Sequence, residues 1–431
     1  MPVRLDARDD GFAARFSALL AARREVSEDV DAAVAAIIAA VIARGDAALA
    51  EYSLRFDRLD VARTPLRVAP AEIEAAMTAS DPRAVAALRL AHERIVAFHE
   101  RQRPVDQRFT DALGVELGWR WSAIQSVGLY VPGGTASYPS SVLMNAVPAK
   151  VAGCERVAMV APAPGGVLNP LVLAAARIAG VDEIWRVGGA QAIAALAYGT
   201  QSIESVAKIV GPGNAYVAAA KRRVFGQVGI DMIAGPSEVL VLADATANPD
   251  WIAADLLAQA EHDAAAQSIL ITDDASLAAA VEAALERQLS TLPRRDIAAA
   301  SWRDYGATIL VGSLAEAIPL VDRLAPEHLE IIAADAEGLA EKIRNAGAIV
   351  IGGHTPEAIG DYVGGSNHVL PTARSARFSS GLGVLDFMKR TSILKCSAEA
   401  LRALGPAAIA LGEAEGLGAH ARSVSIRLNL G

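Results

Sequence analysis

Cysteine is scarce in this sequence, which contains only Cys154 and Cys396 among 431 residues. Two cysteines cannot form the disulfide framework of a small secreted protein, and no Cys-x-x-Cys motif is present. Cys154 follows a predicted helix, where a small buried thiol is far more common than a nucleophile. The cysteine content therefore favours a reducing compartment, and we expect a cytoplasmic protein.

The chain also lacks a basic stripe and a long apolar run. Its net charge is -9, which opposes nucleic-acid binding because phosphate contacts need clustered Lys and Arg. The longest apolar stretch, Ala32–Ala43, falls short of the roughly 20 residues of a membrane span and predicts a buried helix. The charged start lacks the apolar core of a secretory signal. We therefore expect no nucleic-acid or membrane partner and a small-molecule ligand.

Aromatic residues make up only 5% of the chain, whereas hydrophobic residues as a whole reach 53%. Much of the core must therefore consist of Ala, Val, Leu and Ile. With 21% charged residues this is a globular composition, and the length suggests two or three folding units.

Short β-branched runs alternate with helical patterns from about residue 124 onward. We expect strands at Ser126–Val131, Arg156–Ala161, Glu183–Val187, Ala207–Val210, Val239–Ala243, Ser268–Thr272, Ala307–Val311, His328–Ile332 and Ala348–Ile351. Helices are expected between them at Ser140–Gly153, Gly166–Ala179, Ala190–Gly199, Asn214–Phe225 and Asp250–His262. This alternation predicts an α/β protein with parallel sheets, and the number of strands favours two sheets in two domains.

The two ends of the chain have a different pattern. Val26–Tyr52 and Ala69–Arg101 are predicted to be largely helical. The tail beyond Leu382 is also predicted to be helical, with a short extended run at Val424–Leu430.

Glycine-rich turns follow three of the expected strands, at Pro132-Gly133-Gly134, Gly188-Gly189 and Gly211-Pro212-Gly213-Asn214. Such turns let a helix begin close to a strand end, where its free N–H groups can meet an anion. No Gly-x-Gly-x-x-Gly fingerprint is present. The turns alone therefore indicate a ligand crevice without naming the ligand, and ordinary tight turns explain any one of them equally well.

Two pairs of residues have side chains suited to metal binding or acid–base chemistry. Gln259 and His262 lie three residues apart in the last turn of a predicted helix, with Asp255 one turn earlier as a residue that can orient a ligand. Glu327 and His328 come together where a proline ends one helix and an apolar strand begins. When each pair is considered alone, a structural role is more common than a functional one.

Further candidates lie near the end of the chain. Asp361 occurs in a polar, glycine-rich loop, and Glu415 and His420 are five residues apart. By contrast, His92 and His99 are spaced seven apart on a charged helix, which predicts a solvated face.

Nine runs then form one larger pattern. They are Tyr130-Val131-Pro132-Gly133-Gly134, Gly188-Gly189-Ala190-Gln191-Ala192, Gly211-Pro212-Gly213-Asn214, Gly235-Pro236-Ser237-Glu238-Val239, Gln259-Ala260-Glu261-His262, Ala325-Pro326-Glu327-His328-Leu329-Glu330, Gly360-Asp361-Tyr362, Asn367-His368-Val369-Leu370-Pro371-Thr372 and Glu415-Gly416-Leu417-x-Ala419-His420. In this order and spacing, over nearly the whole chain, they resemble the histidinol dehydrogenase family. Asp263 stands where Gly is common in the family, which removes no presumed ligand.

The resemblance implies a zinc- and NAD-dependent enzyme that oxidises L-histidinol through L-histidinal to L-histidine, the last step of histidine biosynthesis. It implies a homodimer in which one zinc ligand comes from the other subunit. The implied zinc ligands are Gln259, His262, Asp361 and His420. Glu327 and His328 are the implied acid–base pair. The implied NAD contacts are Tyr130, Gln191 and Asn214. The implied substrate contacts are Ser237, Gln259, His262, His328, Asp361, Glu415 and His420.

The resemblance also implies two incomplete Rossmann-like domains, one inserted into the other, with small helical terminal segments. We expect residues 1–24 to form an N-terminal helical segment and 382–431 a tail that embraces the partner. Residues 25–129 and 239–381 are expected to form the first domain, and 130–238 the second.

Three rival functions stay open on the sequence alone. One is a paralogue that oxidises another small primary alcohol, such as a sulfonated diol. Another is a metallohydrolase that uses the same zinc without NAD. The third is a non-catalytic zinc- or nucleotide-binding protein, against which the pairing of Glu327-His328 with a full ligand set argues.

Overall fold

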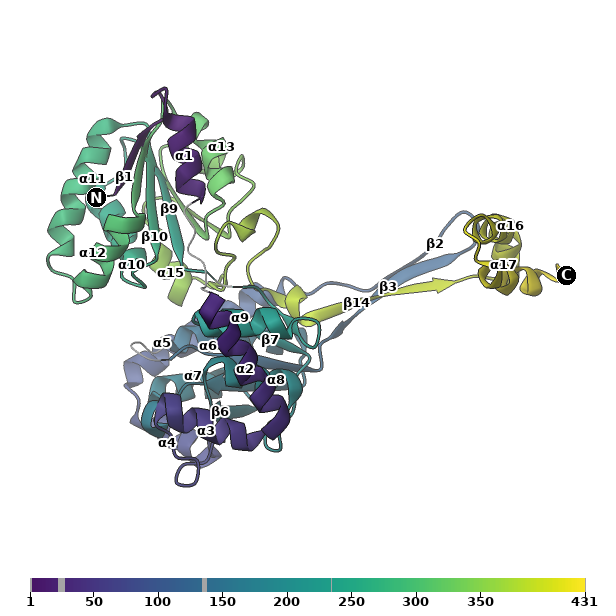
Figure 1. Cartoon of the computed structure of the whole chain (residues 1–431). Helices are drawn as coiled ribbons and strands as arrows, with labels where there is room; N and C mark the ends of the chain where they lie inside the picture. Colours follow the sequence, from purple (N-terminus) through teal and green to yellow (C-terminus); the bar gives the residue numbers. More distant parts are fainter. Residues whose placement is uncertain (1, 22–27, 134–137, 234, 431) are drawn as a thin grey trace.

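The computed structural model describes residues 2–21, 28–133, 138–233 and 235–430 (Figure 1). Gly134 of the first glycine turn and the expected boundary between residues 24 and 25 lie outside these ranges. The described part of the chain forms two α/β units, from which a long ribbon carries the C-terminal helices away (Figure 1).

The first unit is built on six parallel strands in the order β1-β11-β10-β9-β12-β13. Their bounds are Val3–Asp6 (β1), Glu238–Ala243 (β9), Gln267–Thr272 (β10), Ala307–Leu310 (β11), His328–Ile332 (β12) and Ala348–Ile351 (β13). Every residue of β9 and β12 is buried, as expected for central strands of a parallel sheet covered on both faces.

Helices cover both faces of this sheet. One face packs against α1 (Phe12–Ala21), α13 (Leu314–Leu324) and α14 (Ala336–Ala340). The other packs against α10 (Pro249–Ala260), α11 (Ala275–Leu289) and α12 (Arg295–Tyr305). Leu240 of β9 belongs to the first core and Val239 to the second, because successive side chains of a strand point to opposite faces.

The second unit contains five parallel strands in the order β6-β5-β4-β7-β8. Their bounds are Ser126–Tyr130 (β4), Arg156–Ala161 (β5), Glu183–Arg186 (β6), Lys208–Val210 (β7) and Gly229–Ile230 (β8). One face carries α4 (Pro70–Ala79), α5 (Pro82–Glu100), α6 (Pro139–Ala152) and α7 (Pro170–Ala179). The other carries α2 (Glu28–Arg44), α3 (Asp46–Asp57), α8 (Gly189–Tyr198) and α9 (Ala215–Val224).

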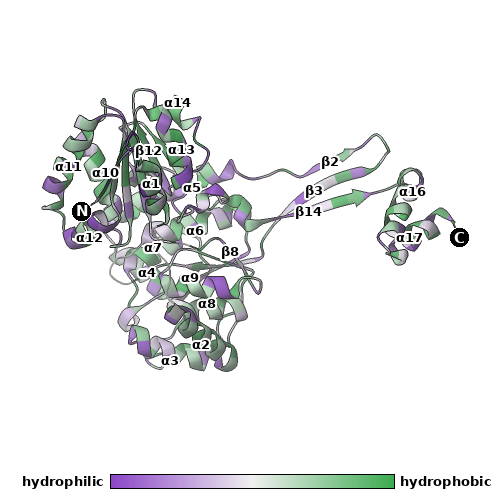
Figure 2. Cartoon of the chain, turned by 45° about the horizontal axis from the view of Figure 1, so that its top comes forward, coloured by the Kyte–Doolittle hydropathy of each residue, from purple (hydrophilic) through white to green (hydrophobic). Residues whose placement is uncertain are grey.

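A third sheet forms the ribbon. It is antiparallel, in the order β14-β3-β2, with bounds Gln107–Thr110 (β2), Glu116–Ala123 (β3) and Met388–Lys395 (β14). At its far end lie α16 (Ala398–Ala414) and α17 (Gly418–Ser425), well away from both units (Figures 1 and 2). None of the helices in the described part of the chain combines the length and the hydropathy of a bilayer span.

The expected α/β class is confirmed, and a strand occurs at each of the nine expected positions. The expected helices at the chain ends are present, as α1 within residues 1–24 and as α16 and α17 beyond Leu382. Two strands were not expected there. Val3–Asp6 forms β1 by pairing with β11, and Met388–Lys395 forms β14 by pairing with β3. The run Val424–Leu430 completes a helix and a short 3-10 turn and is not extended.

The expected grouping of residues 25–129 with 239–381 also differs from the packing. The helix α2 contacts α8 and α9, and α5 contacts α6 and α7, all within the second unit. The apolar face of α2, with Val34 and Ile37, joins the core under the five-stranded sheet. Strand β4 belongs to the same sheet. Most of 28–130 therefore packs with 138–233, whereas β1 and α1 belong to the first unit.

Candidate active site

A cavity of about 1440 Å³ is lined by residues of both units. The five-stranded sheet contributes its carboxyl edge, through Tyr130 at the end of β4 and the turns after β6 and β7. The six-stranded sheet contributes its amino edge. Ser237 and Glu327, which directly precede β9 and β12, line the cavity there. Residues far apart in the sequence thus meet at one cavity between the two units, and small ligands commonly bind at such places in α/β enzymes.

The three residues expected to contact NAD all line this cavity. The Tyr130 hydroxyl accepts a hydrogen bond from the Gly189 N–H at 3.0 Å, which joins the ends of β4 and β6. Gln191 is buried in α8, and its Oε1 has no hydrogen-bond partner among the described residues. Asn214 caps α9, since its side-chain oxygen accepts from the N–H groups of Tyr216 and Val217. Both helices therefore begin at the cavity.

The Glu327 and His328 side chains are held in buried positions at the start of β12. Oε2 of Glu327 accepts the backbone N–H of Glu238 at 2.9 Å, so the neighbouring strand fixes this carboxylate. The other oxygen, Oε1, lies 3.7 Å from Nε2 of His328. Both residues line the cavity, so a base and a carboxylate face the same ligand space.

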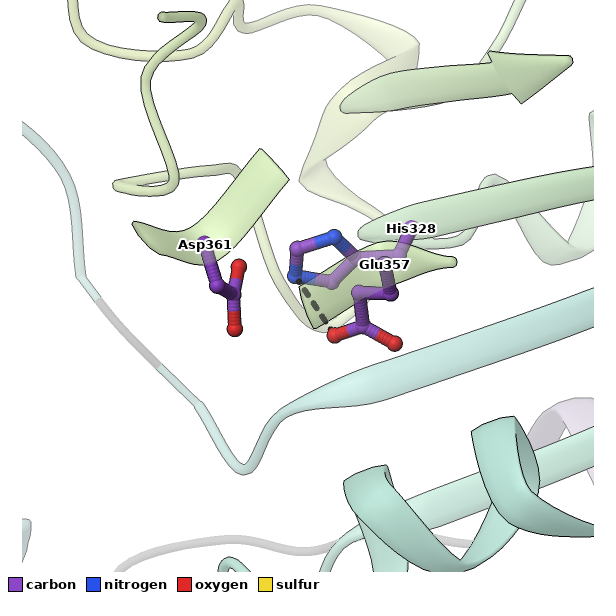
Figure 3. Close-up of side chains that lie close together, drawn as sticks. All are labelled: His328, Glu357 and Asp361. Atoms are coloured by element: carbon purple, nitrogen blue, oxygen red, sulfur yellow. Dashed lines mark ion pairs between the residues drawn. The ribbon is translucent and has the colours of Figure 1, made fainter. Parts of the chain in front are cut away.

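A third group at this position, Glu357, was not singled out from the sequence. Its Oε1 lies 3.3 Å from Nε2 of His328, and ligand atoms of His328, Glu357 and Asp361 lie within 4.8 Å of one another (Figure 3). Glu357 begins a short helix, α15 (Glu357–Tyr362), and its N–H donates to Oε1 of Glu330 at 2.6 Å. A carboxyl in the apolar strand Leu329-Glu330-Ile331-Ile332 is the one sequence signal that could have marked this region.

Burial controls the protonation of this group of residues. It lowers the pKa of His328 to about 4, and the imidazole is therefore neutral near pH 7. Burial, with the nearby Asp361 carboxylate, raises the pKa of Glu357 well above its usual range. The site therefore holds a neutral imidazole beside a carboxyl that retains its proton.

Three of the four expected metal ligands, Gln259, His262 and Asp361, belong to the six-stranded unit. Gln259 is buried in the last turn of α10, and neither its Oε1 nor its Nε2 has a hydrogen-bond partner among the described residues. A buried amide with no partner is costly, which fits a carbonyl oxygen that serves a cation. His262 and Asp361 line the cavity. A set of imidazole nitrogen and amide and carboxylate oxygens suits zinc.

Several local expectations are corrected. The helix α10 ends at Ala260, so His262 lies just beyond its last turn, with its N–H bonded to the Gln259 carbonyl at 3.2 Å. Asp361 lies in helix α15 and not in a loop. Asp255 interacts with Glu330 instead of orienting Gln259.

His99 also differs from its prediction, because it is buried and not solvated. Its Nδ1 lies 2.8 Å from Gln102 Oε1, and its Nε2 lies 3.2 Å from Asn367 Nδ2. Asn367 also donates to the Met144 carbonyl at 2.7 Å. This network anchors the segment before His368 to the second unit.

Glu415 and His420 are not brought to the cavity of their own chain. Glu415 directly follows α16 and His420 lies in α17; both are exposed, and the two helices lie at the tip of the ribbon (Figure 1). Neither residue is among those that line the cavity.

Two parallel-sheet units that share a ligand cavity, with a neutral buried histidine beside carboxyl groups, define a two-domain α/β enzyme. The family model described as histidinol dehydrogenase matches residues 20–428 of the chain. The protein belongs to the histidinol dehydrogenase family.

Individual relatives are similar over their full length. The chain is 71% identical to the histidinol dehydrogenase of Rhodopseudomonas palustris and 69% identical to that of Mesorhizobium japonicum, with 100% of each chain covered. The crystal structure of histidinol dehydrogenase from Elizabethkingia anophelis superposes with a TM-score of 0.94 at 36% identity, covering 99% of this chain and 98% of that one.

Proposed function

We propose that the protein is a histidinol dehydrogenase, which oxidises L-histidinol to L-histidinal and then to L-histidine with NAD as the oxidant. The observation that carries this proposal is the pair Glu327 and His328, buried side by side at the cavity that both units line. Membership of the family over residues 20–428 supports it. The comparisons favour none of the rival functions.

His328 is the base of both oxidations. Its imidazole is neutral at neutral pH because burial lowers its pKa, so it can take the proton of the substrate hydroxyl as the carbon–hydrogen bond breaks. NAD held by Tyr130, Gln191 and Asn214 would supply the hydride acceptor, with one NAD molecule needed for each oxidation. The proton that His328 holds must leave before the second oxidation, when the imidazole takes a proton from the aldehyde hydrate.

Glu327 activates the water that converts the aldehyde to its hydrate. The Glu238 N–H holds Oε2 at 2.9 Å, Oε1 lies 3.7 Å from His328 Nε2, and the residue lines the cavity. A carboxylate fixed in this way can take a proton from water that attacks the bound aldehyde carbon. Because both steps use one cavity, the reactive aldehyde need not be released between them.

Gln259, His262 and Asp361 are the residues of this chain that would hold zinc. A bound zinc ion would supply a template for the amine and imidazole nitrogens of histidinol. Asp361 lies 3.9 Å from His368 Nδ1, whose ring is also bonded to the Asp361 carbonyl at 2.9 Å, so its position is fixed before any metal binds. Ser237 lines the same cavity and serves as a substrate contact.

The remaining expected residues, Glu415 and His420, would reach the cavity of a second copy. The ribbon and its terminal helices expose large apolar side chains that a partner subunit would cover. They are Val105, Phe109, Leu394, Leu411, Leu417 and Ile426. We therefore propose a homodimer in which α16 and α17 of each chain complete the partner's site. The sparse cysteines favour the cytoplasm as its location.

Initial rates of NAD reduction with L-histidinol and with a sulfonated diol, each before and after chelation, test the proposal. We expect turnover with histidinol only, lost on chelation and restored by zinc. Faster turnover of the diol, or histidinol oxidation independent of NAD, would contradict it.

A further inference from the structure

The carboxylate of Asp57 forms part of the cavity wall in the second unit. Asp57 is the last residue of α3, and Arg58 follows it in a left-handed conformation, φ 54, that ends the helix. The Ala163 backbone N–H donates to the Asp57 carboxylate. The oxygen Oδ2 is buried and has no hydrogen-bond partner among the described residues. One acceptor atom of a half-buried anion is therefore left for a ligand.

A buried carboxylate oxygen without a hydrogen-bond donor costs free energy. Burial raises the pKa of Asp57 because it removes water from the charged form. No ion pair to Asp57 is present in the described ranges, although three cations line the same cavity. Of these, Arg55 lies over the Phe56 ring at 5.2 Å, and the Lys221 ammonium is bonded to Asp231 and to the Gly211 carbonyl. The third, Arg294, donates to the His262 carbonyl at 3.5 Å.

The position of this carboxylate in the fold identifies the donor. The strands β4, β5 and β6 are adjacent in the order β6-β5-β4, so β5 has the place that the second strand has in a dinucleotide-binding half. In such folds an acid near the end of the second strand binds the ribose hydroxyls of NAD. Here Pro162 follows β5, and no acid occupies that place. Instead, the Ala163 N–H holds the Asp57 carboxylate at the same strand end.

We propose that Asp57 accepts hydrogen bonds from the ribose diol of the adenosine half of NAD and thereby makes the cavity select NAD over NADP. This inference rests on the proposed use of a nicotinamide dinucleotide. A diol supplies two O–H donors, which match the free carboxylate oxygen and its partly engaged neighbour. The 2′-phosphate of NADP removes one donor and places a second anion beside Asp57 in a poorly solvated site.

Binding of NADH and NADPH, followed by fluorescence titration in wild type and in Asp57→Asn, tests the inference apart from activity. The Asn side chain keeps the size of Asp and loses its charge. Glu51→Gln is the matched control, because Glu51 is an exposed carboxyl on the same helix that pairs with Arg44. Thermal melting verifies that each variant is folded.

In wild type we expect NADH to bind on the order of a hundredfold more tightly than NADPH. In Asp57→Asn we expect NADH to bind about tenfold more weakly and the preference to shrink by at least that factor, as for loss of a charge-assisted hydrogen bond. The control should match wild type. ADP-ribose and its 2′-deoxy form provide a second readout, because loss of the hydroxyl should weaken binding in wild type and have little effect in Asp57→Asn.

An unchanged ratio of NADH to NADPH affinity in a folded Asp57→Asn variant would overturn the inference. Equal weakening of both cofactors would also overturn it, because it would indicate a structural role. These outcomes are separate from failure of the proposed function, which would appear as a wild-type protein that binds NADH but does not oxidise histidinol.

Discussion

Oε1 of Glu330 accepts a hydrogen bond from the backbone N–H of Glu357 at 2.6 Å. The bond joins β12, whose first residue is His328, to α15, which carries Asp361. Glu330 is buried, and burial, followed by the nearby Asp255, raises its pKa to about 9. A protonated carboxyl therefore connects the proposed base to a proposed metal ligand.

Glu330→Gln should make stability less dependent on pH. The folded protein holds the Glu330 proton up to about pH 9, whereas the unfolded chain releases it near the ordinary value of 4.5. Between these values the folded state binds more protons, so wild-type stability falls as pH rises through this window. Gln cannot ionise, and the slope should shrink by about 1 kcal/mol per pH unit.

Denaturant unfolding from pH 5 to 9, in chelator, measures this slope. Glu286→Gln is the control, because Glu286 is exposed on α11 and should behave as wild type. Parallel pH profiles for wild type and Glu330→Gln would show that Glu330 does not carry the pH dependence.

Glu327→Gln should slow the second oxidation more than the first. Gln keeps the size of Glu but cannot take a proton from water, whereas His328 still serves the hydroxyl. We expect the rate of histidinal oxidation to fall about a hundredfold or more, and the rate of histidinol oxidation to the aldehyde to fall less. Single-turnover rates with histidinal and with histidinol measure the two losses of rate. Equal losses on both substrates would leave Glu327 without its proposed task.

His262→Asn should lose zinc. A site that combines nitrogen and oxygen donors tolerates little loss of a nitrogen. We expect about one zinc per wild-type chain and well under a tenth of that in the variant after dialysis, measured by elemental analysis. His354→Asn is the matched control, since His354 is an exposed histidine outside the cavity lining. Full zinc content in His262→Asn would exclude this ligand.

Mixed dimers should recover activity that neither parent has. His262→Asn inactivates the site on its own chain, and His420→Asn inactivates the site on the partner, so a heterodimer retains one intact site. Random exchange of equal amounts should restore about a quarter of wild-type activity. No recovery in a heterodimer verified by mass spectrometry would mean that His420 acts within its own chain.

The sequence predicts the buried parts of the fold well, because central parallel strands are continuous apolar runs. Arg156–Ala161 and His328–Ile332 have their predicted bounds. The ribbon strands were missed because β2 and β14 are largely exposed and lack an apolar pattern. The edge strand β1 was missed for another reason, since four residues become a strand only by pairing with β11, far along the chain.

The site was predicted where a motif carries it and missed where packing alone creates it. Glu327 and His328 are adjacent in the sequence, so their shared position follows from the chain itself. Glu357 and Asp57 have no local signature, and each gains its position from a distant backbone or side-chain contact. Glu415 and His420 are predicted by resemblance, and a single chain does not bring them to the cavity.

The most direct test of the account is the amount of NADH formed per molecule of L-histidinol. Wild-type protein, zinc and excess NAD are incubated with limiting histidinol until absorbance is constant, and the product is identified by mass spectrometry. The account predicts two NADH per histidinol and L-histidine as the product, because one cavity carries out both oxidations. One NADH per histidinol with free aldehyde, or no NADH, would contradict it.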